Sequence, residues 1–261
     1  MNILERLFQF VCIYSCALLL LWTIKFIYGL SDYLIPSPGE LVRIVHSDWV
    51  IYTRAVLNTL AVAIAGHILA VSMAAVIGLL GRTDSRIGHL TRTAAYNLQA
   101  YPIVAVAPII FIFLGNGLAS RLLISAMICY FPLLLSFLGI FSQPVEEVEH
   151  FFRVSGRINW KLEIAVRTFE NLDKLKTVIV GSGTLAMVGT IVAEFLAATN
   201  GIGYMIRKAL YQNNLARILF SLFLIGLCSS VYLSLIETLG NWTRRKLTGN
   251  GHEAGHEPEL Q

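Results

Sequence analysis

The chain has little charge and lacks the patterns that mark many soluble enzymes. Only 14% of its 261 residues are Asp, Glu, Lys or Arg, whereas 56% are hydrophobic. Ordinary soluble domains have about 25% charged residues and roughly 45–50% apolar residues. This difference favours a polytopic membrane protein. The phosphate-binding pattern GxxxxGK[ST] is also missing, so the chain is not expected to hydrolyse ATP itself.

The cysteines argue against two further kinds of structure. All four lie inside apolar runs and none belongs to a CxxC pair: Cys12, Cys16, Cys129 and Cys228. Neither a disulfide framework nor a zinc site is therefore predicted, and we expect small, buried apolar side chains at these positions. The motif HEAGH at 252–256 resembles a zinc-binding pattern, but the glycines around it disfavour the helix that such a site needs. We predict no metal site, no catalytic residue and no cofactor in this chain.

What the sequence does contain is long apolar runs. A helix that crosses the hydrocarbon core needs about 20 apolar residues. Six runs meet this length, at about 7–30, 55–80, 94–115, 118–142, 176–199 and 215–240. The first is too long for the apolar core of a signal peptide, so we expect it to be retained. The sequence predicts an all-α membrane protein with about six transmembrane helices over 1–246, followed by a disordered tail over 247–261.

The Lys and Arg residues indicate which way these helices run. If the N-terminus is cytosolic, most of the basic residues fall in cytosolic segments, at Arg6 and in 82–92, 153–176 and 244–246. The positive-inside rule then predicts that both termini lie in the cytosol. A net charge of +4 is explained by this topology and calls for no nucleic-acid partner.

One compact charged stretch, EEVEHFFRVSGRINWKLE at 146–163, interrupts the apolar chain. The apolar spacing from Val145 to Val154 predicts an amphipathic helix whose first turn is acidic, as the helix dipole favours. Gly156 is expected to end this helix, and Asn159 to cap a second one that reaches Thr168. Such a pair of helices either docks into a groove on a partner or lies on the membrane surface.

Several polar residues stand inside the apolar runs. Glu194 is a candidate for the transport pathway, because an ionisable group within a membrane segment is costly to bury without a function or a partner. Asn58, Asn97 and Gln99 are further pathway candidates, although each could instead form a hydrogen bond between helices. The glycines at 181, 183 and 189 are interpreted as points where helices approach closely.

Three separated stretches resemble a known family: LIPSPGELV, YPIVAVAPIIFIFLGNGLASRLLISAMICYFPLLLSFLGIF and VAEFLAATNGIGYMI. They are similar to the transmembrane permease subunit of ATP-binding-cassette (ABC) importers, nearest to the branch that serves alkanesulfonates, taurine, nitrate and thiamine-precursor pyrimidines. The resemblance runs from about Leu34 to Lys246. It implies a type I importer permease fold in a bacterial inner membrane and a second permease subunit. It also implies cytosolic ATPase subunits that bind ATP and Mg²⁺, and a periplasmic or extracellular substrate-binding protein.

The family's signature lies in a cytosolic coupling loop, here at about 143–176. It reads Glu-Ala-Ala, three residues, Gly, nine residues, an aliphatic residue, two residues and Pro. Aligned on Gly156, the chain has His-Phe-Phe in place of Glu-Ala-Ala and Phe169 in place of the proline. The resemblance assigns ATPase coupling to Glu146, Glu147, His150, Phe151, Phe152, Gly156, Trp160 and Val166. The departures keep two alternatives open, a permease-like scaffold that is not coupled to ATP and one half of a heterodimeric permease.

Overall fold

A computed structural model describes residues 3–83, 85–99, 101–156 and 159–249, and in these ranges all regular structure is helical. Five of the helices are long and apolar enough to cross a membrane. They are α1 (Ile3–Tyr28), α2 (Pro38–Gly81), α5 (Leu118–Ser142), α8 (Leu172–Leu196) and α10 (Leu215–Gly249). The prediction of an all-α membrane protein is confirmed.

The third expected crossing, residues 94–115, is not a single helix. It is divided between α3 (Arg86–Gln99) and α4 (Ile103–Leu114), and Pro102 lies at the N-cap of α4. Proline disfavours helical geometry in the residue before it and cannot donate a backbone hydrogen bond, so the helix breaks here. With 12 residues, α4 reaches about 18 Å, less than the roughly 30 Å hydrocarbon core.

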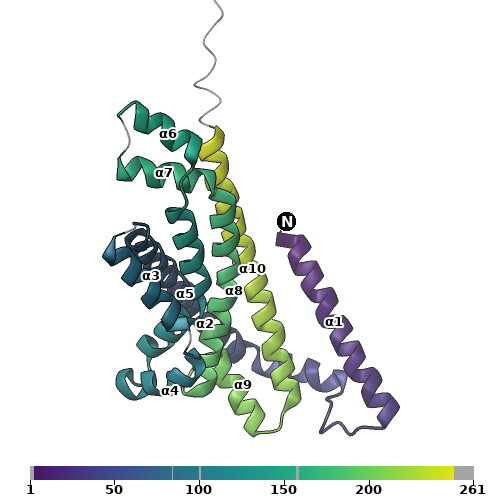
Figure 1. The fold of residues 1–261 in the computed structure, drawn as a ribbon. Coiled ribbons are helices and arrows are strands. Elements are labelled where there is room, and N and C mark those ends of the chain that lie inside the picture. The colour runs from purple at the N-terminus through teal and green to yellow at the C-terminus, as the bar shows by residue number, and fades with distance from the viewer. Residues whose placement is uncertain (1–2, 84, 100, 157–158, 250–261) are drawn as a thin grey trace, which may run out of the picture.

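Contacts between helices show that α2 and α5 run in the same direction. Asn58 of α2 contacts Arg121 near the start of α5, and Gly78 lies against Phe137 near the end of α5. The chain must therefore return from the end of α2 to the start of α5, and α3 and α4 together make that return (Figure 1). Between them they take the place of the expected third crossing.

The other long helices alternate in direction. The C-terminal end of α8 meets the start of α5, so these two helices are antiparallel. Lys176, near the start of α8, contacts Asn241, near the end of α10. Arg6 of α1 pairs with Glu237 of α10 at 2.8 Å. The start of α1 and the end of α10 therefore lie toward the end of the bundle that carries α6 and α7, and α4 and α9 lie at the opposite end (Figure 1).

The core lies where α2, α5 and α8 meet. Ala70, Ala126, Leu134 and Ala186 are buried there, and the small alanines let the helix backbones approach closely. In contrast, α1 has no buried residue, and among the described helices it packs mainly along α10. In a membrane, the exposed apolar side chains of α1 would face lipid.

Several predictions about single residues can be compared with the fold. A β-carbon at Gly183 or Gly189 would come within 3.2 Å or 3.0 Å of a neighbouring helix, which confirms close approach there, whereas Gly181 has no neighbour within 4 Å. All four cysteines are free. Cys129 is buried as expected, but Cys12 and Cys16 are exposed because α1 lies at the periphery. The expected tail at 247–261 begins inside α10, and residues 250–261, with the HEAGH motif, lie outside the described residues.

Candidate functional site

The charged stretch forms two short helices, as predicted: α6 (Glu146–Val154) and α7 (Trp160–Glu170). They lie together at one end of the bundle (Figure 1). Gly156 follows α6 with a φ of +66°, a conformation that favours glycine. The side chain of Asn159 accepts the backbone N–H of Leu162 at 2.9 Å and so caps α7. We call residues 146–170 the coupling hairpin.

A buried ion pair closes the coupling hairpin. The guanidinium of Arg167 on α7 donates to both carboxylate oxygens of Glu149 on α6, from Nε at 2.7 Å and from Nη2 at 3.0 Å. Its Nη1 donates to the carbonyl of Phe141, near the end of α5. The hydrogen bond with Glu149 raises the pKa of Arg167 above its ordinary value. This bidentate geometry fixes α6 against α7, and both against α5.

A second ion pair joins the coupling hairpin to α2. Glu163 on α7 accepts from Arg167 at 2.8 Å and from Arg82, at the C-terminal end of α2, at 3.3 Å. The guanidinium of Arg82 also lies 5.9 Å from the ring centre of Trp160. The coupling hairpin is therefore attached to two long helices, α2 and α5, in addition to the direct chain connection into α8.

Four large apolar side chains of the coupling hairpin are exposed, two on each of its helices. Phe151 is 67% exposed and Trp160 is 53% exposed, and Val154 and Phe169 are exposed as well. We call these four side chains the apolar hairpin face. Of the residues predicted to contact an ATPase, Glu146, Glu147, His150 and Gly156 are exposed, while Phe152 and Val166 are half-buried. Large exposed apolar side chains on short, charged helices are typical of residues that bind a partner.

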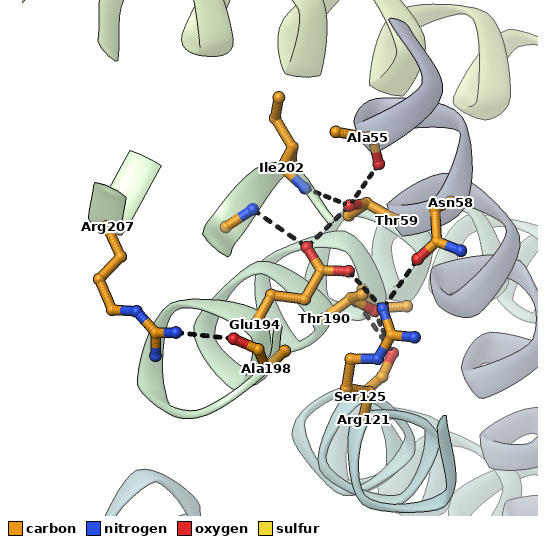
Figure 2. Close-up of polar contacts among 12 residues, drawn as sticks. Ala55, Asn58, Thr59, Arg121, Ser125, Thr190, Glu194, Ala198, Ile202 and Arg207 are labelled. Atoms are coloured by element: carbon orange, nitrogen blue, oxygen red, sulfur yellow. Dashed lines mark hydrogen bonds and ion pairs between the residues drawn. The ribbon is translucent and has the colours of Figure 1, made fainter. Parts of the chain in front are cut away.

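A second polar cluster surrounds Glu194, which is fully buried (Figure 2). Its Oε1 accepts from Arg121 of α5 at 3.1 Å, and its Oε2 accepts from the hydroxyl of Thr59 of α2 at 2.7 Å. The same hydroxyl accepts the backbone N–H of Ile202 at 2.8 Å. Arg121 also donates to the amide oxygen of Asn58 at 2.8 Å. The cluster therefore ties α2, α5 and α8 to α9 (Ile202–Tyr211).

Two glycines allow the chain to wrap around this carboxylate. Gly201 has a φ of +94°, and a β-carbon there would overlap the carboxylate of Glu194. At Gly203 the backbone N–H donates to Oε2 at 3.0 Å, and a β-carbon would lie 2.7 Å from the β-carbon of Glu194. Arg207 then caps α8 by donating to the carbonyls of Phe195 and Ala198 at 2.9 and 2.6 Å. The NGIG stretch is thus the turn that encloses Glu194.

The structure brings together two of the four predicted pathway residues. Asn58 and Glu194 share Arg121 as a partner, and Asn58 also lines an open cavity of about 330 Å³ between α2 and α9. Asn97 is exposed on α3, away from this cluster, and the side chain of Gln99 lies outside what the structure describes. In the described part of the chain, no three His, Cys, Asp or Glu side chains gather as a metal site would require.

Sequence analysis did not single out the partners of these acidic groups. Arg121 stands at the beginning of the apolar run at 118–142, outside the cytosolic segments whose basic residues indicate the topology. The signal that pairs Arg121 with Glu194 is the presence of one basic and one acidic residue in two different apolar runs, because buried charges in a membrane segment need a partner. For Glu149 and Arg167 there was no comparable signal, because both belong to a stretch rich in charges.

No protein-family model matches the chain. The formylaminopyrimidine transport permease protein ThiX of Halalkalibacterium halodurans is 23% identical over 225 residues, which cover 86% of this chain and 90% of ThiX. The riboflavin transport system permease protein RibX of Chloroflexus aurantiacus is 36% identical over 148 residues, 54% of each protein. A Haemophilus influenzae protein named "probable ABC transporter permease protein" is 24% identical over 74% of this chain and 79% of its own length.

These similarities agree with the fold and extend along most of the chain. Permease subunits are not themselves enzymes, in agreement with the prediction that this chain is not one. The curated homologues of this multi-pass membrane chain are permease subunits of ABC transport systems, which confirms the resemblance found in its sequence.

Proposed function

We propose that this chain is the membrane-spanning permease subunit of an ATP-driven importer. It forms, with a second permease subunit, the pathway for a small solute, which crosses by alternating access. ATP and Mg²⁺ are bound by separate ATPase subunits, and a periplasmic or extracellular binding protein delivers the solute. The chain lies in the bacterial inner membrane with both termini and the 143–176 loop in the cytosol.

The observation that carries this proposal is the apolar hairpin face, displayed on a coupling hairpin whose two helices are joined by the buried Arg167–Glu149 ion pair. A loop that only lay on the membrane would not need a buried Arg167–Glu149 pair to hold its two helices at a fixed angle. A loop that transmits force from an ATPase does need such rigidity, together with exposed groups that insert into a partner. Phe151 and Trp160 supply those groups.

The helix connections support the transport mechanism. Through Arg167 and Glu163 the coupling hairpin is bonded to the ends of α5 and α2, and these two helices meet again at Arg121 near the opposite end of the bundle. A displacement of the coupling hairpin is therefore delivered to two long helices that reach the cavity lined by Asn58. For the same reason, Asn58 and Glu194 remain our candidates beside the pathway, with Asn97 and Gln99 as more distant ones.

Co-purification tests the proposal. The tagged full chain is isolated in mild detergent from its own host, and its partners are identified by mass spectrometry. We expect an ABC-type ATPase in equimolar amount and ATP hydrolysis by the isolated complex. A chain that is purified intact without any ATPase contradicts the proposal and supports a permease-like scaffold. Recovery of a second, different permease with the ATPase supports the heterodimer.

A further inference from the structure

A groove of about 290 Å³ lies between the first turns of α8 and the last turns of α10. These turns are at the end of the bundle that carries the coupling hairpin (Figure 1). Its walls are apolar: Ile179 and Val180 come from α8, and Ile236 and Leu239 come from α10. Leu239 is 62% exposed, so the groove opens to the surroundings of the bundle. Both helices that form the groove are long and apolar enough to cross a membrane, so the groove is accessible from the side that lipid would occupy.

Two basic side chains stand at the mouth of this groove, Lys176 and Arg244. The stem of Lys176 crosses Gly240, and its ammonium group donates to the neutral amide oxygen of Asn241 at 2.5 Å. Within the described residues, that ammonium group has no carboxylate within 4.0 Å, so its charge is not balanced by an ion pair. Arg244 pairs with Asp173 at 3.1 Å, and both of these side chains are largely exposed. Two basic side chains and one carboxylate, Asp173, thus stand at the mouth, which gives it a net charge of +1 where the walls are apolar.

The last turns of α10 also mark the depth of the groove. Trp242 is 54% exposed, and the ammonium of Lys246 lies 4.1 Å from its ring centre. Exposed tryptophan beside lysine is the combination that membrane helices use at the boundary between hydrocarbon and headgroups. The mouth of the groove thus lies at headgroup level, and its apolar walls extend toward the hydrocarbon.

We propose that this groove is a binding site for one anionic phospholipid. An acyl chain lies along Ile179, Val180, Ile236 and Leu239, and the phosphate group binds Lys176 and Arg244. Basic pockets between membrane helices favour anionic headgroups over zwitterionic ones. A second copy of this surface would bring the same positive charges together, which disfavours a symmetric protein contact here. The site is separate from the pathway and from the apolar hairpin face, so it goes beyond the proposed function.

Native mass spectrometry of the full chain in detergent tests this site, with phosphatidylglycerol and phosphatidylcholine of identical acyl chains as the probes. The wild-type chain is expected to retain phosphatidylglycerol in preference to phosphatidylcholine. Each basic side chain near a headgroup contributes about fivefold in binding. The double variant Lys176→Gln/Arg244→Gln is therefore expected to lose most of the preference, and Lys176→Arg/Arg244→Lys, which keeps both charges, is expected to retain it.

Two further variants separate this groove from general attraction to basic surfaces. Leu239→Glu places a negative charge in the groove wall and should weaken phosphatidylglycerol binding, although Lys176 and Arg244 remain. Arg54→Gln/Lys208→Gln removes two exposed basic residues from α2 and α9 and should leave the preference unchanged. The proposal is overturned if the wild-type chain binds phosphatidylglycerol and phosphatidylcholine equally, which is also the result expected if the groove is instead a contact for another protein. An unchanged preference in Lys176→Gln/Arg244→Gln, or an equal loss in Arg54→Gln/Lys208→Gln, overturns it as well.

Discussion

Arg121 and Glu194 form an ion pair at 3.1 Å across 73 positions of sequence, and both side chains are almost completely shielded from the surface. Each lies in a membrane-spanning helix, where an unpaired charge would cost several kcal/mol. Asn58 also accepts a hydrogen bond from the arginine, and Thr59 and Gly203 donate to the carboxylate. Among the described residues, only the buried Nε of Arg121 in this cluster has no hydrogen-bond partner. This arrangement explains why two opposite charges can be kept in otherwise apolar runs.

We expect Glu194→Ala to destabilise the chain strongly. It leaves the Arg121 guanidinium buried without its carboxylate, and breaking one side of a buried pair typically costs about 3–5 kcal/mol. The midpoint of thermal unfolding in detergent should fall clearly. In the double variant Arg121→Gln/Glu194→Gln neither charge remains, so its loss should be smaller than the sum of the losses in the single variants Arg121→Gln and Glu194→Gln.

This measurement also distinguishes two roles for Glu194. If the carboxylate serves only the solute, Glu194→Gln should abolish uptake and leave the unfolding midpoint at the wild-type value. If it holds α2, α5, α8 and α9 together, stability and uptake should fall together. Additive losses in the double variant would show that Arg121 and Glu194 are not energetically coupled.

The turn around Glu194 should not tolerate a side chain at Gly201. Gly201→Ala combines a left-handed backbone with overlap between its methyl group and the Glu194 carboxylate. Strain of this kind costs about 1–3 kcal/mol, and the overlap adds to it. Gly181→Ala is the matched control, because a β-carbon there meets no atom within 4 Å and alanine favours a helix. A lower unfolding midpoint for Gly181→Ala than for Gly201→Ala would contradict this view of the turn.

Sequence analysis predicted most elements of this fold because hydrophobicity and length decide them. Five of six apolar runs are helices of the expected kind, and the hairpin at 146–170 has the glycine break and the Asn159 cap that its residues predict. The exception is the run at 94–115. Its apolar composition suggested one crossing, but Pro102 interrupts the helix, and α4 is too short to span the membrane by itself.

The sites were less predictable, since they depend on contacts between distant segments. Glu194 was recognised as unusual from its neighbours in sequence, but its partners Arg121 and Thr59 come from two other helices. Spacing along α6 did show which residues are apolar. It did not show that Glu149 would turn inward to Arg167 while Phe151 turns outward, because that choice is made by packing against α7 and α5.

We expect Glu149→Gln to loosen the coupling hairpin without unfolding the bundle. The change leaves Arg167 with Glu163 and the Phe141 carbonyl but removes the bidentate partner that fixes α6. Amide hydrogen exchange in residues 146–154 should become at least tenfold faster, while exchange in α5 stays close to that of the wild type. Glu146→Gln, at an exposed position of the same helix, should have little effect. If hydrogen exchange in α6 of Glu149→Gln is unchanged, the ion pair between Arg167 and Glu149 does not hold this helix in place.

The apolar hairpin face should be required for coupling rather than for folding. Phe151 is 67% exposed, so Phe151→Asp removes little packing within the chain but places a charge where we expect an apolar pocket of the ATPase. Uptake and ATPase co-purification should fall at least tenfold, whereas the unfolding midpoint and the amount of chain in the membrane should not change. Phe152 is a poorer choice for this test, because it is half-buried and its substitution would also disturb the coupling hairpin.

Phe151→Leu is the matched control, because it keeps an apolar side chain at the same exposed position. It should retain most of the uptake and of the ATPase co-purification. The contrast between Asp and Leu therefore measures the need for an apolar group, separately from the need for an aromatic ring. Wild-type uptake in Phe151→Asp, with the ATPase still bound, would mean that the ATPase engages the chain through another surface. A Phe151→Leu variant as inactive as Phe151→Asp would instead indicate that the ring itself fills the partner's pocket.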